Sequence, residues 1–354
     1  MIKVASLTSG KFDPSSRLRV RQHIKSLKAS GIEVVEFIPL IDKYAPLPFL
    51  PKNCSLPYYA VPLPQLWQVI KLCTRIPGIL GSLKSHITWL LRDLLPGCLT
   101  LEPFLKKPLV FDIDDAIWLN RLFGPNPAVS IAKRADVVIA GNAYIADRLG
   151  GLARSIHIVP TAVDTEKFKP PPLAPRETTG RFTVGWIGTA SNLNYLLSIE
   201  KPLAAFLSDR HDTELLVVSN DVPRFRVLSA DRVHYIPWSE ENEVNALKRI
   251  DTGIMPLPDN DSTRGKCSYK MLLYMSCGIP VVVSPVGMNL EVLGKGASGL
   301  VAQRDADSYE AFSSLYEAKG SAEAYGQTGR RVVETYYSQK KISREIADIF
   351  KGLR

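Results

Sequence analysis

The chain contains few of the residues that build disulfide frameworks and metal sites. Its 354 residues include five histidines and five cysteines, which are Cys54, Cys73, Cys98, Cys267 and Cys277. No CxxC pair, HExxH motif or other cluster with metal-ligand spacing is present. We therefore expect free thiols in a reducing compartment and no zinc site.

Long apolar runs are absent as well. No stretch approaches about 18 uninterrupted apolar residues, so no membrane-spanning helix is predicted. The sequence begins MIKVASLTSG, which is typical of a first strand rather than a signal peptide, and we expect a cytoplasmic protein. With 45% hydrophobic and 22% charged residues, the composition excludes wholesale disorder and rod-like structures, and the length favours two domains.

Positive charge is unevenly distributed along the chain. Residues 1–110 hold 15 Lys and Arg against 6 Asp and Glu, whereas the remaining residues hold 29 of each. Such a field attracts an anionic partner, either a membrane surface, a phosphorylated substrate or nucleic acid. A basic surface that serves only solubility is the alternative. We expect no nucleic acid, because no helix-turn-helix or series of stacking aromatics accompanies the charge.

Short apolar runs alternate with amphipathic stretches, which predicts an α/β fold with two successive parallel sheets. The predicted strands are 2–7, 33–38, 108–113 and 136–140 in the first half, and 182–187, 214–219, 233–236, 251–255 and 280–284 in the second. The predicted helices are 16–30, 145–149, 194–208, 240–248, 269–276, 307–319 and a closing stretch from about 321 to 354. The proline-rich segment 169–180 is predicted to be a hinge, because prolines lack N–H donors.

Segment 82–95 is unusual for such a domain. Read as a helix, it places apolar side chains on one face and basic ones opposite, with Trp89 at the edge. A basic amphipathic helix with an aromatic residue can lie at an anionic membrane surface, where it would bind anionic vesicles. An ordinary helix that covers the sheet is the alternative.

The segment after strand 251–255 is the most informative. A polar loop with Arg264, Gly265 and Lys266 leads into helix 269–276, and Lys270 lies in the first turn of that helix. A helix N-terminus supplies unpaired N–H groups and a partial positive charge, so we expect this loop to receive a diphosphate. A surface loop that happens to be basic is the alternative. No G-x-G-x-x-G follows a strand, which disfavours nicotinamide binding.

This segment, with R-G-K-C-S-Y-K before Y-M-S-C-G-I-P-V-V-V-S-P-V-G, resembles the signature of retaining GT-B glycosyltransferases of family 4 (glycosyl transferases group 1). Stretches 111–115, 159–165 and 184–189 agree with the resemblance. It implies two Rossmann-like doubly wound domains facing a cleft: an acceptor-binding domain at 1–168 and a nucleotide-sugar-binding domain at 181–335. It further implies that a closing helix at 336–354 packs back on the first domain, and that retaining sugar transfer needs no metal and no cofactor.

The resemblance also implies site residues. Arg264, Lys270 and Asp114 are expected to be catalytic, the two cations by stabilising the leaving diphosphate. The expected donor-binding residues are Gly188, Thr189, Ser219, Trp238, Gly265, Lys266, Cys267, Ser268 and Glu291. For Trp238, plain packing is the alternative.

In two places the sequence departs from the family pattern. Where much of the family has a Glu-x7-Glu pair, this chain has Gly265 and Leu273, so the ribose contact must come from elsewhere. The family's Arg and Lys after the first strand of the second domain fall near Thr189 and Asn194. Arg264, Lys266 and Lys270 are therefore expected to bind the diphosphate in their place.

In the first domain, polar residues follow the predicted strands, whose carboxyl ends face the ligand in such sheets. The expected acceptor or cleft residues are Gly10, Ser16, Arg17, Asp115 and Asn142. Ser15 or Ser16 is expected to cap the helix that starts there, and helix capping is the alternative role of Asp115.

Two functions remain open. The first is transfer of a sugar from a nucleotide sugar to a glycan acceptor of the cell envelope or a surface polysaccharide, lipid-linked acceptors included. The second is a degenerate GT-B protein that binds sugar nucleotide or polysaccharide without transfer, suggested by the two missing carboxylates.

Overall fold

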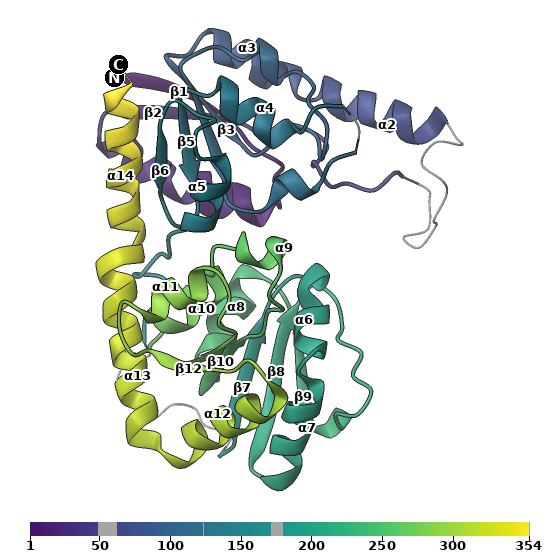
Figure 1. Ribbon diagram of the computed structural model, residues 1–354, viewed down its shortest axis with the longest axis vertical. Helices are drawn as coiled ribbons and strands as arrows, with labels where there is room; N and C mark the ends of the chain where they lie inside the picture. Colours follow the sequence, from purple (N-terminus) through teal and green to yellow (C-terminus); the bar gives the residue numbers. More distant parts are fainter. Residues whose placement is uncertain (49–61, 123, 171–179, 354) are drawn as a thin grey trace. The chain divides into compact units, whose positions relative to one another are not determined.

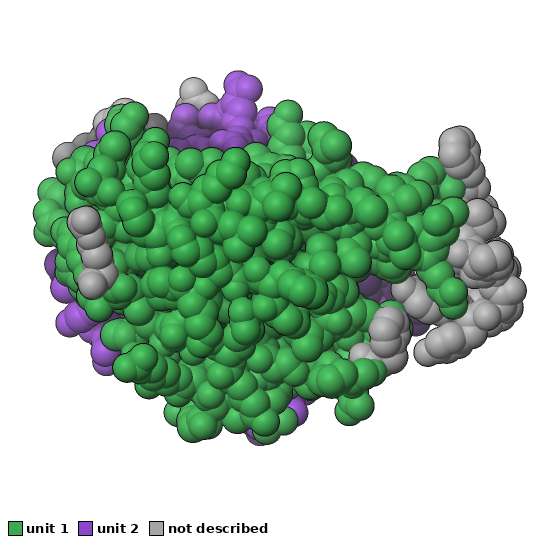
Figure 2. All heavy atoms as spheres, turned by 90° about the horizontal axis from the view of Figure 1, so that it is seen from above, with its two compact units in different colours: residues 1–162, 265–267, 339–354 green, residues 163–264, 268–338 purple. Residues whose placement is uncertain are grey.

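The computed structural model describes residues 1–48, 62–122, 124–170 and 180–353 (Figure 1). The chain divides into two compact units, coloured separately in Figure 2. Unit 1 consists of Met1–Ala162, Gly265–Cys267 and Gln339–Arg354, and unit 2 of Val163–Arg264 and Ser268–Ser338. Most of the predicted hinge, 171–179, lies outside the described residues.

Unit 1 is built on a six-stranded parallel sheet with the order β2-β1-β3-β4-β5-β6. Its strands are β1 (Ile2–Leu7), β2 (Ile32–Phe37), β3 (Ile87–Leu91), β4 (Leu109–Ile113), β5 (Val137–Ala140) and β6 (Ile156–Ile158). Strand β1 pairs with both β2 and β3, with Val4 opposite Val34 on one side and Ile87 on the other. The strand order reverses between β1 and β3, and sheets of this kind bind ligands at the carboxyl ends of such a switch point.

The helices of unit 1 are α1 (Ile24–Ala29), α2 (Pro62–Cys73), α3 (Ile76–Leu83), α4 (Pro127–Arg134), α5 (Ala143–Leu149) and α14 (Gln339–Gly352). The predicted helix 16–30 is irregular, because a π-helical turn at Ser16–Val20 and a 3-10 turn at Arg21–His23 precede α1. The prediction that Ser15 or Ser16 caps it is wrong. The Asp13 carboxylate accepts the Ser16 N–H instead (2.8 Å).

Segment 82–95 is not the predicted helix. Helix α3 ends at Leu83, and residues 87–91 form β3, whose five side chains are all buried. Trp89 packs edge-on against Phe350 and donates its Nε1–H to Asp112 (3.2 Å). A central strand of a parallel sheet is covered by helices on both faces, so its sequence is continuously apolar. The periodicity of such an apolar run cannot distinguish a strand from a buried helix. Trp89 and Leu90 are therefore core residues and not a membrane face.

Unit 2 also contains a six-stranded parallel sheet, with the order β12-β11-β10-β7-β8-β9. Its strands are β7 (Phe182–Ile187), β8 (Thr213–Ser219), β9 (Val233–Pro237), β10 (Thr252–Met255), β11 (Val281–Val283) and β12 (Gly299–Val301). Counted from its own first strand, this is the doubly wound order 3-2-1-4-5-6. Its switch point lies between β7 and β10.

The helices of unit 2 are α6 (Leu193–Leu197), α7 (Glu200–Asp209), α8 (Glu240–Leu247), α9 (Asp261–Arg264), α10 (Tyr269–Ser276), α11 (Met288–Leu293), α12 (Asp305–Glu317) and α13 (Lys319–Val332). The predicted helix 194–208 is two helices, α6 and α7, rather than one. Strands β6 and β12 are missing from the sequence prediction, because three residues are too few to show a period.

The closing helix α14 packs on unit 1, as the fold prediction requires. Ile342, Ile346 and Phe350 recur four residues apart, which places them on one face of the helix. They share a buried core with Val4 of β1 and Leu27 of α1. The two ends of the chain therefore fold together in one unit (Figure 1).

His23 makes this packing sensitive to pH. Its side chain is buried, and its Nδ1 lies 2.8 Å from the Ser343 hydroxyl of α14. Burial, reinforced by the nearby Arg19 cation, lowers the pKa of His23 to about 3. An unfolded histidine titrates near pH 6.5, so the unfolded state gains a proton that the folded state does not. Full stability is therefore present above about pH 6.5 and is lost as the pH falls towards 3.

Between pH 7 and pH 5, His23 should remove about 2 kcal/mol from the free energy of unfolding. Urea unfolding at the two pH values measures this loss, and His23→Gln should reduce the loss by about that amount. His211→Gln, at an exposed histidine of unit 2, is the matched control and should retain the full loss. An equal pH dependence of the His23→Gln variant and the wild type would disprove the role of His23.

Candidate functional site

The residues predicted to bind the donor follow the strands of unit 2 at their carboxyl ends. Gly188 and Thr189 come directly after β7, Ser219 is the last residue of β8, and Trp238 follows β9. The loop that leads to α10 follows β10. Because the switch point lies between β7 and β10, the ends of these two strands form the place where such a sheet binds a ligand.

Lys270 brings a cation to the end of β7. It lies in the first turn of α10, and its Nζ is 4.2 Å from the centroid of the Trp186 ring. The Gly188 backbone lies so close to the Lys270 Nζ that a Cβ on residue 188 would collide with it. The aromatic ring and the bare glycine backbone thus hold the ammonium beside the N-terminus of α10. A cation and a helix N-terminus together are suited to bind an anion.

The start of α10 is fixed by neighbouring side chains. Ser268, its N-cap residue, has a left-handed backbone with φ of 48° and is buried. Its hydroxyl donates to the Asn289 Oδ1 (2.7 Å), and the Asn289 Nδ2 donates to the Ser284 carbonyl (3.0 Å). These bonds tie α10 to the chain after β11. The Ser268 hydroxyl, predicted to bind the donor, is thus used to hold this helix in place.

Arg264 lies at the end of α9 with a carboxylate partner of its own. Its Nε donates to the Asp259 Oδ1 (2.6 Å) and its Nη2 to the Asp259 Oδ2 (3.0 Å), and both side chains are largely exposed. The hydrogen bonds from Arg264 lower the pKa of Asp259. A diphosphate would have to displace Asp259 before Arg264 could bind it.

Trp238 and Glu291 are both accessible in unit 2. The Trp238 Nε1–H donates to Glu243 (3.2 Å), while the side chain keeps 39% of its surface exposed. Glu291 is exposed and lies close enough to Tyr337 to act on it. Burial, and after it the negative charge of Glu291, raises the pKa of Tyr337 to about 12. Leu273, which stands where the family has its second carboxylate, is buried in α10 and offers no polar contact.

Three residues predicted for the donor site, Gly265, Lys266 and Cys267, pack within unit 1. A Cβ on Gly265 would lie 2.9 Å from the Ala116 nitrogen, so a side chain does not fit there. The Cys267 thiol donates to the Asp114 carbonyl (3.2 Å). Burial, followed by the charge of Asp114, raises the pKa of this thiol, which stays protonated at neutral pH.

Asn142 holds the same segment from another element. Its Oδ1 caps α5 by accepting the Ile145 N–H (2.8 Å), and its Nδ2 donates to the Lys266 carbonyl (3.0 Å). The residue is buried, with an exposed fraction of 1%. Its amide is therefore engaged at both ends, and its role in this structure is to position the backbone.

The carboxylates that follow the apolar part of β4 are paired with arginines. The Arg19 Nε donates to the Asp112 Oδ1 (2.9 Å), and the Arg92 Nε to the Asp114 Oδ1 (2.5 Å). Burial raises the pKa of Asp112 to about 6, although Arg19 opposes it. Burial also raises the pKa of Asp114, but Arg92 outweighs it and holds that pKa below its ordinary value. Asp115 is more exposed and lies 3.7 Å from the Arg92 Nη2.

The loop after β1 holds the remaining predicted residues. The buried Ser16 hydroxyl donates to Asp13 (2.8 Å), and a Cβ on Gly10 would collide with Asp42. Both residues therefore shape the loop, while Arg17 is half-buried. Nothing in the sequence points to Arg92, because its pairing with Asp114 depends on β3, in a segment whose pattern predicts a helix.

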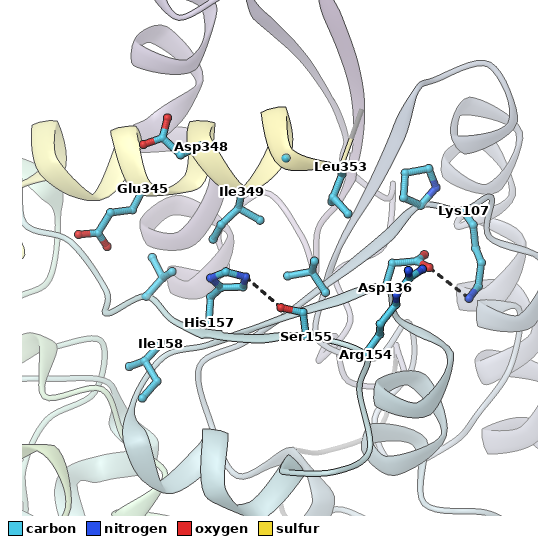
Figure 3. A pocket seen from close by; sticks show the side chains of 14 residues that line it. Lys107, Asp136, Arg154, Ser155, His157, Ile158, Glu345, Asp348, Ile349 and Leu353 are labelled. Atoms are coloured by element: carbon cyan, nitrogen blue, oxygen red, sulfur yellow. Dashed lines mark hydrogen bonds and ion pairs between the residues drawn. The ribbon is translucent and has the colours of Figure 1, made fainter.

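A large cavity lies elsewhere in unit 1, between β6 and α14 (Figure 3). Its volume is about 1180 Å³, and its walls include the Ser155–His157 hydrogen bond (3.1 Å) and the Lys107–Asp136 ion pair (3.5 Å). Lys107, Asp136 and Ser155 precede β4, β5 and β6, so this cavity is at the amino ends of the strands. Ligands of such sheets bind at the opposite edge, and we assign this cavity no role in catalysis.

Known proteins resemble the chain in part of its sequence and in its fold. Residues 181–317 match the family model described as Glycosyl transferases group 1. Sucrose-phosphate synthase from Thermosynechococcus elongatus has a similar structure, with 14% identity, a TM-score of 0.72 and coverage of 100% of this chain and 99% of that chain. Anabaena Alr3699/HepE in complex with UDP and glucose is also similar, with 15% identity, a TM-score of 0.70 and coverage of 100% of both chains.

A third similar structure is WaaG, a glycosyltransferase involved in lipopolysaccharide biosynthesis, at 15% identity and a TM-score of 0.67. Coverage is 99% of this chain and 100% of that chain. No curated protein matches the sequence. The predicted GT-B fold, with two Rossmann-like domains, is confirmed.

Proposed function

We propose that the protein is a retaining glycosyltransferase that moves a sugar, of the hexosyl type, from a nucleoside-diphosphate sugar to a cell-envelope or surface-polysaccharide acceptor. The observation that carries the proposal is the Lys270 ammonium, held over Trp186 and against Gly188 at the switch point of unit 2. The family match over 181–317 supports the reaction class, and the UDP and glucose bound to Alr3699/HepE support the substrate class.

In this mechanism the bond from the sugar to the diphosphate breaks, and negative charge grows on the leaving phosphate. The acceptor hydroxyl oxygen forms the new bond to the same sugar carbon, and its proton passes to that phosphate. Lys270 and the N-terminus of α10 are in place before the reaction, so they stabilise that charge without reorganising. Thr189, at the end of β7, and the exposed face of Trp238 are proposed to contact the rest of the donor.

Asp114 has a different role from that of a general base. Its pKa lies below the ordinary value of a carboxyl, so it takes a proton from a hydroxyl poorly. We propose that Asp114 accepts hydrogen bonds from sugar hydroxyls and that Arg92 keeps it ionised and oriented. Asp115, nearby and more exposed, is proposed to contact the acceptor.

We also propose that transfer needs no divalent metal, because Lys270 and α10 supply the positive charge at the diphosphate. Across the described ranges, no group of three His, Cys, Asp or Glu side chains is placed to hold a metal ion. Purified protein incubated with a panel of sugar nucleotides should release nucleoside diphosphate, and the rate should stay within about twofold in excess EDTA.

Complete loss of release in EDTA, restored by magnesium or manganese, would contradict metal independence. A protein that binds a sugar nucleotide in calorimetry but never releases its diphosphate, with or without glycan acceptors, would be the binding protein of the alternative interpretation. The panel also identifies the donor, because a ligand that binds only the folded state raises the Tm.

Peripheral attachment to an anionic membrane, on the inner face of the plasma membrane, is proposed on residues other than those of segment 82–95. Helices α2 and α3 expose large apolar side chains, each more than 40% accessible: Leu66, Val69, Ile70, Ile76 and Leu80. The basic excess of residues 1–110 adds attraction to anionic lipids. Within the described ranges, no helix has the length and hydropathy needed to cross a bilayer.

A further inference from the structure

A small cavity lies in unit 1 at the carboxyl ends of its first three strands. Thr8, which follows β1, Ile38, which follows β2, and Leu94, beyond β3, contribute to its walls, and Arg75 closes it from the turn between α2 and α3. The sheet order reverses between β1 and β3, so the cavity is at the switch point of this sheet. Its volume of about 40 Å³ holds roughly three waters or one compact group, since a water needs about 10–15 Å³.

Arg75 lines this cavity with a guanidinium that has no partner in the part of the chain that the structure describes. The side chain is only 4% exposed, and its Nε, Nη1 and Nη2 all lack a hydrogen-bond acceptor. Burial lowers the pKa of Arg75 to about 10, with Asp42 opposing, so the group is cationic at neutral pH. A buried cation with five unused N–H donors is costly unless an anion completes it.

The surroundings of Arg75 add positive charge. Lys71 and Lys43 are both buried, and the Lys71 Nζ donates to the Lys43 carbonyl (3.0 Å). The Lys43 ammonium pairs with the buried Asp93, so that carboxylate is already committed. Asp42 accepts a backbone N–H with its Oδ1 (2.9 Å) and shows no ion pair to Arg75 among the described contacts. Among the described residues, neither Lys71 nor Arg75 therefore forms an ion pair, and Asp42 is the carboxylate whose charge acts on Arg75.

We propose that this cavity binds a phosphate group of the acceptor through Arg75. The planar guanidinium fork matches two phosphate oxygens. Pro77 and Gly78 of the first turn of α3 also line the cavity, but they offer it no free N–H, since Pro77 has none and the Gly78 N–H donates to the Arg75 carbonyl (3.0 Å). With Asp42 counted, Lys71 and Arg75 still leave a net positive charge for an anion to balance, and the guanidinium fork favours phosphate. Assignment to the acceptor rests on the proposed function, whereas the phosphate site itself does not. A lipid headgroup and a soluble sugar phosphate share this chemistry.

The test is titration of the full chain with inorganic phosphate by calorimetry, in saturating UDP so that phosphate cannot report on the Lys270 site. The wild type should bind phosphate, and Arg75→Met should weaken binding by at least about tenfold. Lys84→Met removes an exposed cation from the other end of α3 and should leave binding unchanged. No binding to the wild type, or equal binding to folded Arg75→Met, would overturn the site.

Stability separates an anion site from a structural arginine. Without phosphate, Arg75→Met should be at least as stable as the wild type, because it removes an uncompensated buried charge. Phosphate should raise the Tm of the wild type and not that of the variant. A variant that is destabilised in phosphate-free buffer, with the same phosphate-dependent rise as the wild type, would show a structural role only. If Arg75→Met does not fold, Arg75→Lys, which lacks the fork, should still show weakened phosphate binding.

Competition then identifies the source of the phosphate. A soluble sugar phosphate that displaces inorganic phosphate indicates a soluble acceptor, and displacement by vesicles containing phosphatidic acid alone indicates a lipid-linked one. Failure of the proposed transferase function looks different: no sugar nucleotide would bind or release its diphosphate, while the Arg75-dependent binding of phosphate would persist.

Discussion

Lys270→Ala should lower the turnover of the nucleotide sugar by about 100- to 1000-fold, as expected when one preorganised group at a developing charge is removed. The ammonium is held in place by the Trp186 ring, 4.2 Å from its centroid, and by the backbone of Gly188. Because the group also contacts the bound diphosphate in our mechanism, the affinity for nucleoside diphosphate should fall together with kcat. Initial rates of diphosphate release, and calorimetry with UDP, measure the two effects.

Gly188→Ala tests the same site without removing a charge. The added Cβ would collide with the Lys270 Nζ and force the ammonium away from the end of β7, so the variant should lose turnover as well. Lys295→Ala is the matched control, since Lys295 also lies over an aromatic ring, that of Tyr336 (5.3 Å), but on an exposed part of unit 2. Wild-type turnover in Lys270→Ala would remove Lys270 from the mechanism.

Much of the fold follows from the sequence because parallel strands flanked by helices leave a clear alternation. The predicted strands 2–7 and 182–187 match β1 and β7 to the residue. The failure at 82–95 has a physical cause: a strand covered on both faces has no polar period, and its charged neighbour Lys84 gives it a false amphipathic pattern. Pairing with β1 and β4, which the sequence does not show, decides its structure.

The position of a candidate residue was predictable where local chain geometry decides it. The place of Lys270 in the first turn of α10 follows from the loop and helix pattern alone. Trp186 could not be recognised as its partner, since an aromatic in an apolar strand is typical of plain core. Arg264 stays a predicted phosphate ligand, and its ion pair with Asp259, five residues earlier, was not apparent from the sequence. Arg75 belongs to no motif in the sequence. Its guanidinium is buried among segments that are distant in the chain, and the sequence does not show that it lacks a hydrogen-bond acceptor there.

Arg19→Met should destabilise the protein by about 3–5 kcal/mol, the usual cost of breaking a buried ion pair from one side. Arg19 and Asp112 are 2% and 0% exposed, with 2.8 Å between the Arg19 Nη2 and the Asp112 Oδ1. Arg19 also donates to the Val159 carbonyl (2.8 Å), so its loss leaves two buried acceptors to satisfy. Urea unfolding measures the cost. The control is Lys341→Met in the exposed pair Lys341–Glu345 of α14 (3.2 Å), which should cost at most about 1 kcal/mol.

The penalty in Arg19→Met should itself depend on pH. Burial already raises the pKa of Asp112 to about 6 with Arg19 present, and removal of that cation raises it further. An acid whose folded pKa is raised loses stability as the pH rises from its unfolded pKa, about 3.9, to the folded one, because the unfolded state releases the proton more readily than the folded state. Arg19→Met should therefore be less impaired at pH 5 than at pH 8, and adding Asp112→Asn should recover part of the loss at pH 8. A penalty that is equal at both pH values and unchanged by Asp112→Asn would mean that packing of the arginine side chain, and not its charge, stabilises the core of unit 1.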